Sequence, residues 1–342
     1  MTEPGAELVV PQGQQHRLWG RTLVVVGWTL RIVGTLAGLI GIQRGRTAGT
    51  AQDPWGTPYW GRVLMAAGLF VVGSLLFLAG RFLAARGRQH VAHIIRTLDE
   101  IGRKPFVLYL RPFTDDPVRA RMPSPDPNSS IGSVFRLSGR TQEETLRRLF
   151  RPFGVMVAIG RPGERLPLPG ALRAYLPLDD WQDTVARLIA QARLVVLGAG
   201  PGPGTIWELV EAVRAIPPAR LVLIVHHDEA VYEQFRQAAA AEFAARLPRL
   251  RQEKGPGWTP PVFPAYPPLT RPERLTSDYV LKGMICFGPG WEPRFIRFDP
   301  TAPRRRSRAA LAKEVNRSLE PLLRYLKEPG TAPVPGSPPN AA

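Results

Sequence analysis

Two long apolar stretches lie near the start of the chain. Leu23 to Ile42 and Val63 to Phe82 are each about 20 residues long, the length that an α-helix needs to cross a hydrocarbon core of about 30 Å. A cleavable signal peptide has a shorter apolar run, followed by a small-residue cleavage site. The pattern therefore predicts two transmembrane helices, at about residues 23–42 and 63–82, and makes the lipid bilayer the first expected partner.

Charged and small residues refine this membrane region. Two arginines precede the first span and six basic residues lie at or after the end of the second, against three arginines in the loop between them. This balance predicts a multi-pass protein of the cell membrane with both termini in the cytoplasm. Gly34 and Gly38 have the spacing that allows close helix packing, either within one chain or between copies. Arg31 lies near the middle of the first span, and we interpret it as a packed interface residue. The alternative is a gating or partner-sensing charge.

From Pro105 the pattern changes to short apolar runs that alternate with helical segments. This alternation is typical of a parallel β-sheet with helices on both faces. The predicted strands are Phe106–Leu110, Val155–Ile159, Ala174–Leu176, Leu194–Leu197 and Leu221–Val225, with a terminal hairpin at Met284–Phe287 and Arg294–Phe298. A capping box at Thr141–Glu144 opens a predicted helix that ends at Phe150. The other predicted helices are Asp180–Ala192, Thr205–Ile216, Ala230–Arg246 and Arg304–Lys327.

These patterns divide the chain into six parts. We predict a cytoplasmic tail at 1–20, a two-span region at 21–88, a juxtamembrane helix at 89–103, an α/β domain at 104–228, its C-terminal extension at 229–328 and a disordered tail at 329–342. The fold class is therefore α/β, with a two-helix transmembrane hairpin ahead of the sheet domain.

Composition excludes several kinds of site. The net charge of +17 comes from arginines that are spread along the chain, so no nucleic-acid partner is expected. The single cysteine, Cys286, excludes an intrachain disulfide and a cysteine-rich zinc site. His90 and His93 are one helical turn apart and are interpreted as a solvated face, so no metal site is predicted.

Standard catalytic motifs are also missing. The sequence has no phosphate-cradling P-loop and no nucleophile elbow. Gly198, Gly200 and Gly202 suggest a dinucleotide fingerprint, but Pro203 stands where its third glycine belongs, and the segment follows a late strand.

A further pattern is distributed over Pro105 to Val225. Tyr109, Arg111 and Asp115 lie within or after the first strand, a Gly/Pro-rich loop follows the second strand, and a helix with a tryptophan near its start leads into an apolar strand. Thr205, Trp207 and Glu211 follow in a later helix. In this order and spacing, the pattern resembles a Toll/interleukin-1 receptor (TIR) domain. Glu208 stands where the family commonly has cysteine, and the insertion at 117–139 is unusual for it.

The resemblance implies a flavodoxin-like fold and, for catalytic members, hydrolysis of the nicotinamide–ribose bond of NAD. A carboxylate beside the ribose stabilises the oxocarbenium-like transition state. Carried over, Glu211 is the catalytic candidate and Glu208 the second. The substrate-binding candidates are Tyr109, Arg111, Asp115 and Trp207. NAD enters as a substrate, so no cofactor is expected.

Glu208 and Glu211 could also have purely structural roles. Thr205 and Glu208 have the spacing of a capping box, and Glu211 is one turn further along the same predicted helix. Two functions follow. The first is a membrane-tethered TIR-like signalling domain that hydrolyses NAD when copies cluster through the glycine-rich spans and the loop at 160–170. The alternative is a non-enzymatic membrane-anchored scaffold that binds a partner protein or a nucleotide.

Overall fold

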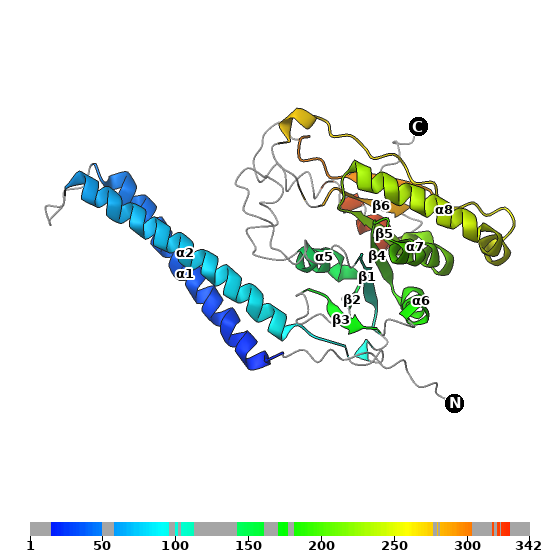
Figure 1. Ribbon diagram of the computed structural model, residues 1–342, viewed down its shortest axis with the longest axis horizontal. Helices are drawn as coiled ribbons and strands as arrows, with labels where there is room; N and C mark the ends of the chain where they lie inside the picture. Colours follow the sequence, from blue (N-terminus) through cyan, green and yellow to red (C-terminus); the bar gives the residue numbers. More distant parts are fainter. Residues whose placement is uncertain are drawn as a thin grey trace. The chain divides into compact units, whose positions relative to one another are not determined.

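The chain folds into two compact units in the computed structural model (Figure 1). One is a pair of long helices within residues 12–92, and the other is an α/β domain that begins at His93. The structure describes residues 15–49, 58–95, 100–101, 104–112, 142–160, 170–176, 181–275, 279, 281–302, 317, 320–321 and 323–328. Asp115, the predicted disordered tail and nearly all of the loop at 160–170 lie outside these residues.

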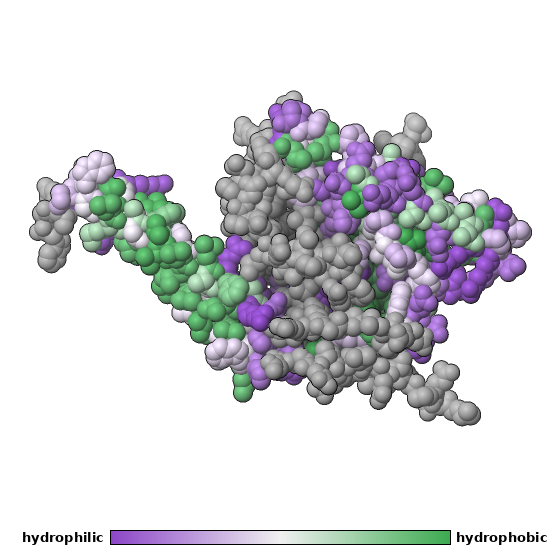
Figure 2. All heavy atoms as spheres, in the orientation of Figure 1, coloured by the Kyte–Doolittle hydropathy of each residue, from purple (hydrophilic) through white to green (hydrophobic). Residues whose placement is uncertain are grey.

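The first unit contains both predicted spans. Helix α1 runs from Arg17 to Thr47 and α2 from Tyr59 to Val91. Only 17% of the most apolar window of each helix is buried, which separates these helices from the core helices of soluble proteins. Apolar side chains cover the outside of the pair (Figure 2). Both helices are long and apolar enough to cross a membrane, as the sequence predicts.

Helices α1 and α2 are antiparallel and meet along a seam of small residues. The seam residues repeat every seven positions: Gly20, Gly27, Gly34 and Gly41 lie against Gly87, Gly80, Gly73 and Ala66 respectively. An added Cβ at Gly34 would lie 2.5 Å from the carbonyl oxygen of Gly73, so the backbones touch there. A seven-residue period keeps one seam facing the partner helix when the pair supercoils. The glycine-rich faces are thus used within a single hairpin.

Arg31 lies in this seam with 8% of its surface exposed. Its guanidinium carbon is 4.3 Å from the ring centroid of Trp28 and 5.5 Å from that of Phe77. Stacking on aromatic faces partly replaces the hydration that the cation loses. The contacts agree with a packed interface residue.

The α/β domain is built on a seven-stranded sheet in the order β3-β2-β1-β4-β5-β6-β7. The strands are β1 Phe106–Leu110, β2 Val155–Gly160, β3 Leu172–Tyr175, β4 Leu194–Gly198, β5 Leu221–Val225, β6 Gly283–Phe287 and β7 Pro293–Arg297. The first five are parallel, and β6 and β7 are antiparallel to their neighbours. The α/β class and the terminal hairpin are confirmed.

Helices cover both faces of the sheet (Figure 1). On one face lie α6 Trp181–Gln191, α7 Pro203–Ala215 and α8 Glu229–Lys254, and on the other lies α5 Gln142–Phe150, which continues into the 3-10 turn η3 Arg151–Phe153. Two more 3-10 turns are η4 Pro218–Arg220 and η5 Pro272–Arg274. Side chains of β1 alternate between two separate cores, with Leu108 and Leu110 in one and Val107 and Tyr109 in the other.

The predicted juxtamembrane helix at 89–103 is not formed as a separate element. Helix α2 continues to Val91, after which the chain becomes extended and Ile94 forms a parallel bridge with Arg173 of β3. The amide of Ile95 donates a hydrogen bond to the carbonyl oxygen of Arg173 at 2.7 Å, and its side chain fills the core under the sheet edge. Tertiary packing of that side chain overrides the helical periodicity of the segment.

The seam predicts unequal effects of alanine at two glycines of α1. Gly34→Ala overlaps the backbone of α2 and is expected to cost about 1–3 kcal/mol of helix pairing. Gly38 has no atom within 4 Å of an added Cβ, so Gly38→Ala is the matched control and should change little. The measurement is the SDS mole fraction at which the helix pair separates, followed through Trp28 fluorescence in a full-length protein whose other seven tryptophans are replaced by phenylalanine. Equal midpoints for the two variants would contradict the seam.

Candidate functional site

The predicted site residues fall on opposite faces of the sheet. Tyr109 is 1% exposed and lies in the core on the side of α5. Trp207 is half-buried on α7, where its ring packs against Trp181 of α6 with centroids 5.1 Å apart. Strands β1 and β4 separate these two groups. The described structure therefore does not bring Tyr109 and Trp207 into one pocket, and Asp115 lies outside the described residues.

A buried ion cluster occupies the end of β1. One carboxylate oxygen of Glu143 accepts hydrogen bonds from Arg111 at 2.9 Å and from Arg173 at 2.7 Å. The other accepts the backbone amide of Ala171 at 2.8 Å. All three charged side chains are almost fully buried. The cluster ties β1, β3 and the start of α5 together, and it gives Arg111 a partner within the protein itself.

Local sequence explains how this cluster forms. Glu143 lies in the first turn of α5, where the helix dipole favours a negative charge. Gly170 has a φ of +145° and passes so close that an added Cβ would lie 2.9 Å from the Oε1 atom of Glu143. The sequence reasoning missed Glu143 and Arg173 as a pair. The available signal was an arginine inside an apolar strand, since such a charge needs a buried counter-ion.

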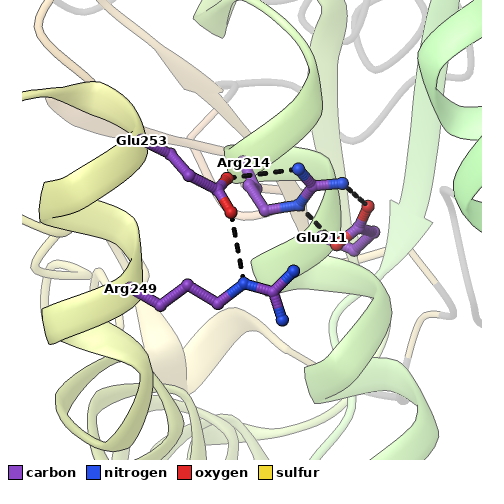
Figure 3. A network of polar contacts seen from close by, with 4 residues as sticks. All are labelled: Glu211, Arg214, Arg249 and Glu253. Carbon is purple, nitrogen blue, oxygen red and sulfur yellow. Dashed lines mark hydrogen bonds and ion pairs between the residues drawn. The ribbon is translucent and has the colours of Figure 1, made fainter.

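Glu211 is held by an ion pair on its own helix (Figure 3). Arg214, one turn further along α7, donates to both carboxylate oxygens of Glu211, at 2.9 Å through Nε and at 2.5 Å through Nη2. Arg214 also donates to Glu253 of α8 at 3.2 Å, and Arg249 donates to the other oxygen of Glu253. These bonds raise the pKa of Arg214, mainly through Glu211, and lower the pKa of Glu253, mainly through Arg214. The network joins α7 to α8.

Glu208 has a different environment. The predicted capping box with Thr205 is not formed, because α7 begins at Pro203 with Gly202 as its N-cap and no side-chain cap bond. Glu208 makes no hydrogen bond or ion pair in the part of the chain that the structure describes. Burial raises the pKa of this half-buried carboxyl group to about 8. It is therefore largely protonated at neutral pH.

The sheet has a topological switch point between β1 and β4, where ligands of open α/β sheets commonly bind. Its described lining is closely packed: an added Cβ at Gly200, after β4, would lie 2.7 Å from Cγ of Pro112, after β1. Among the described residues, no group of three or more His, Cys, Asp or Glu side chains is placed to hold a metal ion.

Removing the carboxylate of the buried cluster should destabilise the domain. Glu143→Gln leaves two buried guanidinium groups beside a neutral amide, with an expected cost of about 3–5 kcal/mol. Glu144→Gln, at the half-buried neighbouring position, is the control and should cost less than about 1 kcal/mol. The measurement is denaturant unfolding of the full-length protein in detergent, followed by tryptophan fluorescence. A cost for Glu143→Gln as small as that of the control would contradict the role of the cluster.

The environment of Glu208 predicts a pH dependence of stability. The folded state keeps this proton up to about pH 8, whereas the unfolded chain releases it near the ordinary value of 4.5. In that window the folded state binds more protons, so stability falls as pH rises, by up to about 1.4 kcal/mol per pH unit. Glu208→Gln should remove this component and make the protein more stable than wild type at pH 8, but not at pH 4.5.

The measurement is the free energy of unfolding of the full-length protein at both pH values. Glu233→Gln, which removes a half-exposed carboxylate from α8, is the control for loss of one negative charge. A Glu208→Gln variant with the wild-type slope would show that the carboxyl group titrates normally in the folded state.

Comparison with known proteins does not extend these findings. No family model matches the chain, and no curated protein or solved structure matches it either. The resemblance to TIR domains therefore depends on the sequence motifs alone.

Proposed function

We propose that this protein is a membrane-anchored module whose α/β domain acts by binding rather than by hydrolysing NAD. The main observation behind the proposal is that the carboxylate of Glu211 is already paired with Arg214. Both of its oxygens accept hydrogen bonds from Arg214. A carboxylate that stabilises an oxocarbenium-like transition state must instead face the ribose.

Glu208 is poorly suited to replace Glu211 in that chemistry. Breaking the nicotinamide–ribose bond builds positive charge on the sugar, which an ionised carboxylate stabilises. Burial holds Glu208 in its neutral form at pH 7, with a pKa of about 8. A neutral carboxyl group donates a hydrogen bond but offers no charge to the transition state.

The proposal includes a TIR-like fold for the α/β domain and a cytoplasmic location for both termini. The parallel strands follow the order β3-β2-β1-β4-β5, which is the order of dinucleotide-binding doubly wound sheets. The flavodoxin-like order that a TIR-like module would have is obtained only if β3 is regarded as an added edge strand, so the TIR-like assignment depends on the sequence motifs. The antiparallel hairpin places the start of α1 and the end of α2 at one end, where Arg17, Arg21, Arg86 and Arg88 lie. This arginine excess supports a cytoplasmic α/β domain with both termini on that side.

Self-association in the membrane is also proposed, through surfaces outside the occupied seam. Gly38 and Gly68 have no atom within 4 Å of an added Cβ, so these positions leave room for a second hairpin. The loop at 160–170 is a second candidate contact. Clustering of tethered domains would raise their effective concentration for a shared ligand.

The test is nicotinamide release from NAD by the full-length protein, with one copy per nanodisc or many copies per liposome. We expect release at the level of empty nanodiscs in both states. Release by the wild type that is lost in a folded Glu211→Gln variant, but kept in Glu233→Gln, would overturn the proposal. Glu233 is a matched control because it forms an i,i+3 pair with Arg236 on α8.

The same variants test the structural role of Glu211. Glu211→Gln removes the buried carboxylate partner of Arg214 and should lower stability by about 1–3 kcal/mol. The cost for Glu233→Gln should stay below about 1 kcal/mol, because that pair is more exposed.

A further inference from the structure

A basic pocket lies at the amino ends of the parallel strands, and the switch point lies at their carboxyl ends. Its volume is about 630 Å³, within the range of small-molecule sites. It is formed by residues just before β1, by the exposed side of α5, by η3 and by the start of β2. The described lining residues are Lys104, Pro105, Glu144, Arg147, Arg148, Arg151, Gly154, Val155 and Met156.

The charge of this lining is strongly positive. Four basic side chains face one acidic side chain, Glu144. Neither Arg147 nor Arg151 forms an ion pair or a side-chain hydrogen bond within the described part of the chain. Arg147 and Arg151 are four positions apart, so consecutive turns present them together. Guanidinium groups bind phosphate oxygens in pairs of hydrogen bonds, which makes a phosphate the best-matched ligand.

Backbone geometry gives the pocket a defined floor. Gly154 has a φ of +140°, and an added Cβ there would overlap the carbonyl oxygen of Pro105. The amide of Val155 donates to the same oxygen at 3.3 Å. Glycine therefore permits the close approach of η3 to the start of β1, which brings Lys104 to the same pocket as the arginines.

The connection between α2 and the α/β domain is short. Only Ala92 and His93 separate the last residue of α2 from Ile94, which is already bridged to β3. The chain therefore passes from the second apolar helix into the domain almost without a linker, and anionic phospholipids at a bilayer surface attract basic side chains. Half-exposed Val155 adds an apolar rim.

We propose that this basic pocket binds a phosphate group. The group comes either from the headgroup of an anionic phospholipid or from a soluble phosphate ester, and the two sources share the same chemistry. The pocket is a local hollow rather than an extended basic stripe, which favours a small phosphate ligand over nucleic acid. The proposal extends the binding function above by naming a ligand class, and for membrane lipid as the source it rests on that function's membrane anchor.

The experiment uses the full-length protein in nanodiscs of phosphatidylcholine, with or without phosphatidylglycerol. Inorganic pyrophosphate is titrated into the neutral nanodiscs and its binding is measured by calorimetry. In parallel, amide hydrogen exchange over residues 142–156 is compared between the two lipid compositions. Binding of pyrophosphate alone identifies a soluble ligand, and slower exchange in phosphatidylglycerol identifies the headgroup.

Variants make the assignment specific. Arg147→Gln with Arg151→Gln should weaken pyrophosphate binding at least about tenfold and remove the lipid-dependent protection. Lys104→Gln, on a different element, should weaken both in the same direction. The matched control is Arg187→Gln with Arg251→Gln, which removes two exposed arginines from α6 and α8 outside the pocket.

Two results would overturn the proposal: no response to either probe, or equal losses in the pocket and control variants, which would indicate attraction to the overall charge. This failure is distinct from failure of the proposed function. Nicotinamide release would refute the binding module without touching the phosphate site, and absence of phosphate binding would leave the hydrolysis assay unchanged.

Discussion

Burial of the central strands on both faces is the constraint on which the α/β domain depends. Every residue of β1, β4 and β5 is buried, with α6, α7 and α8 packed on one side and α5 on the other. No ligand can reach the middle of such a sheet, so binding sites are confined to the two ends of the parallel strands. At the carboxyl ends, Arg111 is paired with Glu143 and Pro112 packs on Gly200. At the amino ends lies the open basic pocket.

The buried charges of the domain serve its architecture. Glu143 lies between two arginines from different strands, and removing either kind of partner would strand a charge in the core. Glu211 is satisfied by Arg214, which also reaches α8. Two carboxylates that differ in sequence context thus have the same task, which is to compensate arginines where elements meet. Glu208 is the exception, and its environment favours the neutral acid.

The helix pair follows a different physical rule. Lipid tails are as apolar as the side chains that face them, so helices in a bilayer associate through close backbone contact rather than through the hydrophobic effect. The seven-residue glycine repeat gives that contact along the whole seam, and Arg31 is accommodated by stacking on Trp28 and Phe77. The pair fills its own seam, and its exposed apolar side chains lie on the outer faces.

The sequence by itself determined the elements whose signal is local. Apolar length predicted the two spans, and short apolar runs predicted the strands, because both patterns record which residues avoid water. Tertiary structure alone decided how those elements combine. It placed Tyr109 and Trp207 on opposite faces of the sheet, paired Glu143 with Arg173, and bridged Ile94 to β3 instead of leaving it in a helix. It also formed the basic pocket from two stretches of chain, residues 104–105 and 144–156. Each outcome depends on contacts between residues far apart in the chain, and periodicity along the chain does not carry that information.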